Sequence, residues 1–149
     1  MNDNNKDFVR RFYETAYVQH DLDQAAEMLA PSYVLSDPSE PTLVQGIEQW
    51  KEVQRMYLSA FPDHRLTISH QIAEDDFVLT HWSISGTHFG DLPGVPATQK
   101  PIEVSGMTLS RVANGKVAEE WQNWDTEGLL EQLGFEMVVP DIENKLKAA

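Results

Sequence analysis

The chain has 149 residues, 41% of them hydrophobic, which is enough for one compact domain around a single core. Its 24 acidic and 11 basic residues give a formal net charge of −13, so the surface should repel nucleic acid and anionic membranes. The sequence contains no cysteine, which excludes disulfides, thiolate catalysis and thiolate metal sites. No apolar run approaches the roughly 20 residues of a membrane span, and the polar N-terminus lacks the layout of a signal peptide. We therefore expect a cytoplasmic protein that binds neither nucleic acid nor membranes.

The N-terminal part of the chain is predicted to be mainly helical. Apolar residues recur at helical spacing over residues 7–20, and a second short helix is expected over 24–29. Residues 33–35 form a short strand candidate. A third helix should span residues 46–61, because Pro62 disfavours helical geometry in the residue that precedes it.

Beyond this helical part the apolar period shortens from about 3.6 towards 2, which predicts strands. Residues 65–73 and 77–86 flank an acidic turn and read as one hairpin. Residues 102–112 and 117–124 read as a second hairpin, joined by an Asn-Gly turn at 114–115. Helices followed by antiparallel strands predict the α+β class, with a curved sheet that encloses a pocket against the helices.

The stretch between the two hairpins, residues 86–101, contains three glycines and three prolines. That composition is too irregular for a strand and suits a structured loop at the mouth of the pocket. A plain long connection between strands explains it equally well.

Four segments resemble the SnoaL-like polyketide cyclase, or ester cyclase, family. They are AFPD (60–63), GTHFGDLPGVPAT (86–98), SGMTLSRVANGKVAEEW (105–121) and WDTEGLLEQLG (124–134). The resemblance implies a nuclear transport factor 2-like cone, in which a curved antiparallel sheet wraps around three N-terminal helices, and usually a homodimer. It implies a single SnoaL-like domain over residues 1–149, with a core at about 7–134 and a C-terminal extension over 135–149 that has no evident role.

The resemblance also implies a chemistry. In characterised cyclases of the family, an acidic residue acts as general acid/base in an intramolecular aldol closure, without a metal or an organic cofactor. By resemblance, Asp125 takes that position and His88 matches a family histidine at the pocket mouth, so both are candidate catalytic residues. The expected ligand is a small apolar carbonyl compound that is cyclised or isomerised. The chain departs from the family pattern at four positions, which leave the substrate open: Ser36, His81, Ala97 and Gln99.

The surroundings of Asp125 depend on which face of the last strand is concave. Simple alternation puts Trp121, Asn123 and Asp125 on one face, and Gln122 with Trp124 on the other. If the first face is concave, Asp125 lies in an apolar cone, where burial would raise its pKa and make it a useful acid/base.

A structural role explains Asp125 as well. Residues 126–133, ended by Gly134, are a helix candidate, and aspartate is among the preferred N-cap residues. A cap faces the positive end of the helix dipole, which would lower the pKa instead. Both interpretations stay open from the sequence.

The remaining candidates concern ligand binding. Tyr33, Trp82 and Trp121 could line the cavity, although aromatic residues at such spacings usually fill the core. Met107 could supply an apolar wall, and Asn123 or His88 could donate a hydrogen bond to an enolate oxygen. The glutamates at 103, 119 and 120 are expected to be solvated.

No pair of histidines has metal-ligand spacing, so we expect no metal site. A different class of function, a non-catalytic ligand-binding or dimerisation module of the same fold, stays open.

Overall fold

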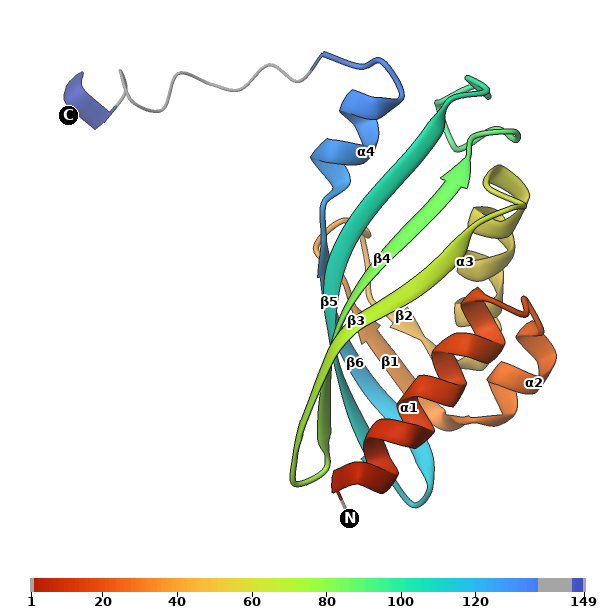
Figure 1. Ribbon diagram of the computed structural model, residues 1–149, viewed down its shortest axis with the longest axis vertical. Coiled ribbons are helices and arrows are strands. Elements are labelled where there is room, and N and C mark those ends of the chain that lie inside the picture. The colour runs from red at the N-terminus through yellow and green to blue at the C-terminus, as the bar shows by residue number, and fades with distance from the viewer. Residues whose placement is uncertain (1, 137–145, 149) are drawn as a thin grey trace.

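The computed structural model describes residues 2–136 and 146–148 (Figure 1). Three helices cover one face of a curved sheet: α1 (Asn2–Tyr17), α2 (Leu22–Glu27) and α3 (Gly46–Ala60). A fourth helix, α4 (Thr126–Gln132), follows the last strand at one end of the sheet. Most of the predicted C-terminal extension lies outside the described residues.

Six strands form the sheet. They are β1 (Leu29–Ser36), β2 (Val44–Gln45), β3 (Arg65–Glu74), β4 (Phe77–Thr87), β5 (Pro101–Ala113) and β6 (Lys116–Trp124). Their order is β2-β1-β6-β5-β4-β3, so the two predicted hairpins lie side by side and β1 joins them next to β6. The predicted α+β class is therefore confirmed, with one difference. The sheet is mixed rather than purely antiparallel, because β1 and β6 run parallel.

Local sequence explains the turns. The hairpin between β5 and β6 turns at Asn114 and Gly115, which both have positive φ, 51° and 71°. A two-residue turn of that kind matches the twist of the strands that it joins. The segment between β4 and β5 is a loop, as its glycines and prolines predicted.

The core lies between the helices and the concave face of the sheet. On α1, Val9, Phe12, Tyr13 and Ala16 are buried at helical spacing, and Trp50 of α3 is fully buried among them. Each large apolar side chain buried in this way contributes about 1.5–3 kcal/mol of stability. The helices are thus fixed against the sheet by the same amphipathic pattern that predicted them.

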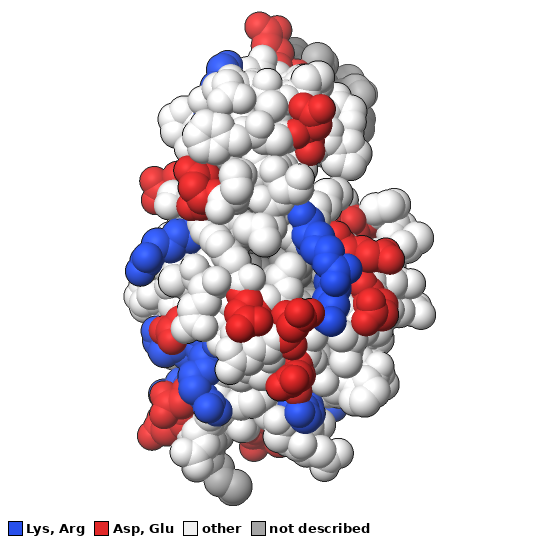
Figure 2. Space-filling view, turned by 90° about the vertical axis from the view of Figure 1, so that its right-hand side faces the viewer, with Lys and Arg blue, Asp and Glu red and all other residues white. Residues whose placement is uncertain are grey.

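Charged side chains are mixed on the outside. On the side that carries the helices, lysine and arginine are interspersed with aspartate and glutamate, with broad uncharged areas between them (Figure 2). Ion pairs join Lys51 to Asp23 and Lys6 to Asp3. Within the described part of the chain, no helix is both long enough and apolar enough to cross a membrane.

Candidate active site

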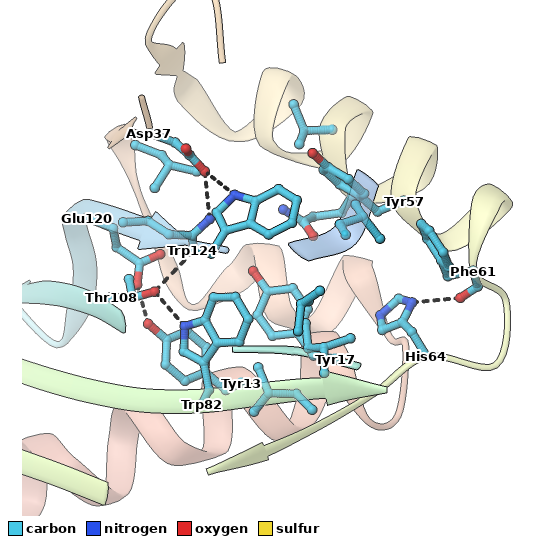
Figure 3. Close-up of a pocket in the computed structure, with 18 of the residues that line it drawn as sticks. Tyr13, Tyr17, Asp37, Tyr57, Phe61, His64, Trp82, Thr108, Glu120 and Trp124 are labelled. Carbon is cyan, nitrogen blue, oxygen red and sulfur yellow. Dashed lines mark hydrogen bonds between the residues drawn. The ribbon is translucent and has the colours of Figure 1, made fainter. Parts of the chain in front are cut away.

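A cavity lies between the concave face of the sheet and the helices α1 and α3 (Figure 3). Its volume is about 110 Å³, which corresponds to roughly four water volumes. Pockets for drug-sized ligands begin at about 300 Å³, so this cavity suits a small molecule or the reacting end of a larger one. Six aromatic side chains line it: Tyr13, Tyr17, Tyr57, Phe61, Trp82 and Trp124.

The concave face of β6 carries Glu120, Gln122 and Trp124. The predicted alternation from Trp121 to Trp124 is observed, and the face of Gln122 and Trp124 is the concave one. A β-bulge lies upstream of these residues: Val117 and Ala118 are both buried, and pairing with β5 shifts register between Arg111 and Val112. One extra residue on a strand reverses which side chains point inward.

Glu120 is 2% exposed and accepts three hydrogen bonds from hydroxyl groups. Tyr13 and Ser110 donate to Oε2 at 2.7 and 2.6 Å, and Tyr33 donates to Oε1 at 2.8 Å. Burial raises the pKa of Glu120 above its ordinary 4.5, against the three donors, which favour the ionised form. The expectation that Glu120 is solvated was therefore wrong, because α1, β1 and β5 converge on it.

A second network runs along the cavity wall. The Trp82 indole donates to Oγ1 of Thr108 at 2.9 Å, and this hydroxyl donates to Oε1 of Gln122 at 3.1 Å. Nε2 of Gln122 and the Trp124 indole both donate to Oδ2 of Asp37, at 2.9 and 3.1 Å. Both indole rings and the amide are thereby held in fixed orientations (Figure 3).

Asp37 ends this network at the start of the loop after β1. Its Oδ1 accepts two more hydrogen bonds, from the backbone N–H and the hydroxyl of Ser39. Four bonds fill the usual capacity of a carboxylate, so Asp37 is better placed to hold Gln122 and Trp124 than to take a proton.

Gly106 of β5 permits the close approach of the two indoles. A Cβ at this position would lie 2.6 Å from atoms of both Trp82 and Trp124. A larger residue would therefore displace at least one ring from the cavity wall.

His64 faces the cavity from the turn between α3 and β3, and it is only 8% exposed. Its Nδ1 lies 2.8 Å from the carbonyl oxygen of Phe61. A carbonyl can only accept, so Nδ1 carries the hydrogen of the neutral ring and Nε2 presents a lone pair. Nε2 has no hydrogen-bond partner among the described residues, and the ring turns it towards the cavity (Figure 3).

The surroundings of His64 keep it neutral. Burial lowers its pKa below the ordinary 6.5, while the bond to Phe61 acts in the opposite direction. The ring of His20 lies 4.4 Å away, centroid to centroid, and adds to the lowering. A neutral imidazole with a free nitrogen is a suitable general base.

The candidates from the family resemblance lie elsewhere. Asp125 is exposed and caps α4, with its carboxylate accepting the backbone N–H of Gly128 at 2.9 Å. The capping role is therefore observed, and Asp125 does not line the cavity. His88 is fully buried in the loop after β4, where Nδ1 accepts the N–H of Thr98 and the ring stacks on Phe61. The catalytic roles of Asp125 and His88 stay predictions.

The five residues expected to bind the ligand are dispersed. Trp82 lines the cavity, and Tyr33 lies behind it against Glu120. Met107, Trp121 and Asn123 lie on the outer face of the sheet, around a shallow depression, with Met107 50% and Trp121 36% exposed. The structure thus brings only Trp82 of this set into the cavity.

The cavity residues that sequence reasoning missed are His64, Asp37 and Glu120. His64 directly follows the AFPD segment, and Asp37 stands in a Ser-Asp-Pro turn. Each residue therefore lies in or beside a recognisable sequence feature, but that feature does not show where the side chain lies in the folded chain. In residues 2–136 and 146–148, no three histidine, aspartate or glutamate side chains converge as a metal site requires.

The family model of the SnoaL-like polyketide cyclases matches residues 7–133. The chain belongs to this family. Among curated protein sequences, none matches the chain at a significant level.

Solved structures agree with this assignment. A proposed polyketide cyclase from Acidithiobacillus ferrooxidans is 30% identical, with a TM-score of 0.76 over 87% of this chain and 93% of that one. IdmH, a proposed polyketide cyclase from Streptomyces antibioticus, is 29% identical, with a TM-score of 0.77 over 88% and 99%. AclR, a proposed hydroxylase from Streptomyces galilaeus, is 24% identical and shares the fold, with a TM-score of 0.82 over 99% and 92%.

Proposed function

We propose that the protein catalyses cofactor-independent proton transfer on a small, largely apolar carbonyl compound, leading to an aldol-type cyclisation or a related isomerisation. The observation that carries this proposal is the free Nε2 of a neutral His64 in an aromatic cavity. Membership of the SnoaL-like polyketide cyclase family is consistent with it.

In this mechanism Nε2 of His64 takes a proton from the carbon next to the carbonyl group. The negative charge moves to the carbonyl oxygen, which needs a hydrogen-bond donor. Tyr17 and Gln54 line the same cavity and can donate to it. Burial and the nearby Glu120 raise the pKa of Tyr17 well above its ordinary 10.0, so its hydroxyl keeps the proton.

The second half of the reaction returns that proton. In a cyclisation, the enolate carbon attacks a second carbonyl group of the same molecule, and the new alkoxide takes the proton from His64. In an isomerisation, the proton returns to a different carbon. Neither route needs an oxidant or a reductant, since the numbers of protons and electrons are unchanged.

The test is deuterium uptake at the carbons next to the carbonyl of cyclopentanone and 1-indanone in D2O, followed by proton NMR. The wild-type protein should accelerate this exchange, and His64→Gln should reduce the acceleration by about 100-fold or more, the usual contribution of a general base. His70→Gln is the matched control, because His70 is exposed on β3 away from the cavity.

Asp125→Asn separates the two assignments of the base. Asparagine preserves a helix cap, so this variant should fold normally and retain the exchange activity. Loss of activity in Asp125→Asn with retention in His64→Gln would return the catalytic role to Asp125. No acceleration by the wild-type protein would favour the ligand-binding module.

We also propose that the protein is a homodimer formed through the outer face of the sheet. This face exposes apolar side chains, among them Phe77 (38% exposed), Met107 and Trp121. The Phe77 and Trp121 rings lie 6.3 Å apart, so the exposed area is continuous there. Light scattering after size-exclusion chromatography should give twice the chain mass, and Trp121→Arg should give a monomer. A monomeric wild-type protein would refute this assembly.

A further inference from the structure

The cavity has an unbalanced charge. Asp37, Glu40 and Glu120 line it, and no lysine or arginine stands among the described residues around it. His64 is held neutral by burial. None of the three ion pairs Lys6–Asp3, Lys51–Asp23 and Arg111–Glu119 involves these carboxylates. Acidic groups taken partly out of water without a cation are costly, and a positively charged ligand would offset that cost.

Two aromatic rings form a corner beside the carboxylates at the cavity mouth. Tyr57 and Trp124 meet edge to face, with centroids 6.4 Å apart and an interplanar angle of 86°. Each ring is tied to a carboxylate, Trp124 to Asp37 at 3.1 Å and Tyr57 to Glu40 at 3.4 Å. Electron-rich ring faces next to carboxylates are the arrangement that attracts organic ammonium ions.

The hydrogen bonds within the wall leave a buried acceptor without a partner among the described residues. The indole N–H groups of Trp82 and Trp124 and the amide N–H of Gln122 already have acceptors within the wall. Nε2 of the 92%-buried His64 is an acceptor turned into the cavity without a partner among the described residues. This nitrogen suits an incoming group that donates a hydrogen bond, and the acidic lining favours a positively charged group over a carboxylate or phosphate.

We propose that the ligand of this cavity is an organic cation, with a protonated or quaternary amine held between Tyr57, Trp124, Asp37 and Glu40. This inference rests on the proposed function only for the location of the site, and it names the substrate class. The volume of about 110 Å³ accommodates a compact alkylammonium group. The substrate is accordingly an amine-bearing carbonyl compound rather than an acid.

The test compares ligands of one shape and different charge. Choline, 3,3-dimethylbutan-1-ol and 3,3-dimethylbutanoate have branched heads of the same shape. The head of choline is a cationic ammonium group, and the head of the alcohol is neutral. In 3,3-dimethylbutanoate the neutral head lies next to an anionic carboxylate. Binding is measured by isothermal titration calorimetry, and the indole N–H signals of Trp82 and Trp124 in nitrogen-edited NMR spectra locate it. Choline should bind at least 10-fold more tightly than the alcohol, and the carboxylate should not bind detectably.

Variants connect this preference to the carboxylates. Glu40→Gln, at the half-buried mouth, and Asp37→Asn should each reduce the preference for choline by several-fold. Glu119→Gln is the control, because Glu119 pairs with Arg111 away from the cavity. If Asp37→Asn unfolds, Glu40→Gln alone decides. Equal binding of choline and the alcohol, binding that leaves both indole signals unmoved, or an unchanged preference in Glu40→Gln would overturn the inference.

The binding assay needs no turnover, so its outcome is separate from the exchange assay. Cation preference without ketone exchange would retain this inference and reject the proposed catalysis. Exchange that depends on His64, without cation preference, would do the reverse.

Discussion

Replacing Tyr33 by phenylalanine removes one hydroxyl group and keeps the ring. The change deletes the donor to Oε1 of Glu120 at 2.8 Å, while Tyr13 and Ser110 still donate to Oε2. A hydrogen bond to a charged group contributes about 1.5–3 kcal/mol. We expect Tyr33→Phe to lower the free energy of unfolding at pH 7 by about 2 kcal/mol and the melting temperature by about 4–8 °C.

Urea unfolding followed by tryptophan fluorescence measures this cost. Tyr57→Phe is the matched control, because its bond to Glu40 is long, at 3.4 Å, and lies at the cavity mouth. A weak bond in that position should contribute less than about 1 kcal/mol. Both variants should keep the wild-type dependence on urea concentration, since neither changes the surface exposed on unfolding.

A double-mutant cycle with Glu120→Gln tests the reasoning itself. A neutral amide accepts a weaker hydrogen bond, so in this background the cost of Tyr33→Phe should fall to about 1 kcal/mol. The same cost in both backgrounds would show that the Tyr33 hydroxyl does not act through the Glu120 carboxylate. That result would refute the buried cluster as described.

Three further predictions concern packing, capping and pH. Gly106→Ala should destabilise by about 1–3 kcal/mol, because its Cβ would meet Trp82 and Trp124 at 2.6 Å; an unchanged urea midpoint would mean that the rings can move aside. Asp125→Ala should cost about 1 kcal/mol in the same assay and Asp125→Asn very little; equal losses would contradict the cap. Because burial lowers the pKa of His64, the unfolded chain takes up a proton on this residue at a higher pH than the folded chain does. The free energy of unfolding therefore falls as the pH drops from about 6.5 to the lowered pKa of the folded state. His64→Gln should flatten the stability profile in that range, and an unchanged slope there would exclude His64 as its source.

The fold could be predicted because its signals are local. Helix α3 follows the spacing of apolar residues and ends where Pro62 requires it, at Ala60. The hairpin of β5 and β6 follows from its Asn-Gly turn. The parallel pairing of β1 with β6 has no such local signal, because the chain between the two strands is long and the partner is chosen by tertiary packing.

The site was harder to predict because it depends on which face of β6 is concave. The side chains of β6 alternate regularly from Glu120 to Trp124, and the sequence does not show which of the two faces meets the helices. Each face carries an indole and an amide side chain, Trp121 with Asn123 and Trp124 with Gln122, so the residue types do not decide between them. His64 is similar, because its role also depends on the ring of His20, which lies next to His64 only in the folded chain.

The parallel contact between β1 and β6 determines the chemistry of the cavity. Leu35 pairs with Glu120, which places Tyr33 on one side of that carboxylate and Asp37 beyond it, within reach of Gln122. A shift of one residue along this contact would turn the side chains of β1 to the opposite face and separate both carboxylates from their donors. The register of these two strands therefore fixes two acidic side chains together, Glu120 at the base of the cavity and Asp37 at its mouth. A substitution that loosens the contact between β1 and β6 should disturb both ligand binding and the stability of the Glu120 cluster.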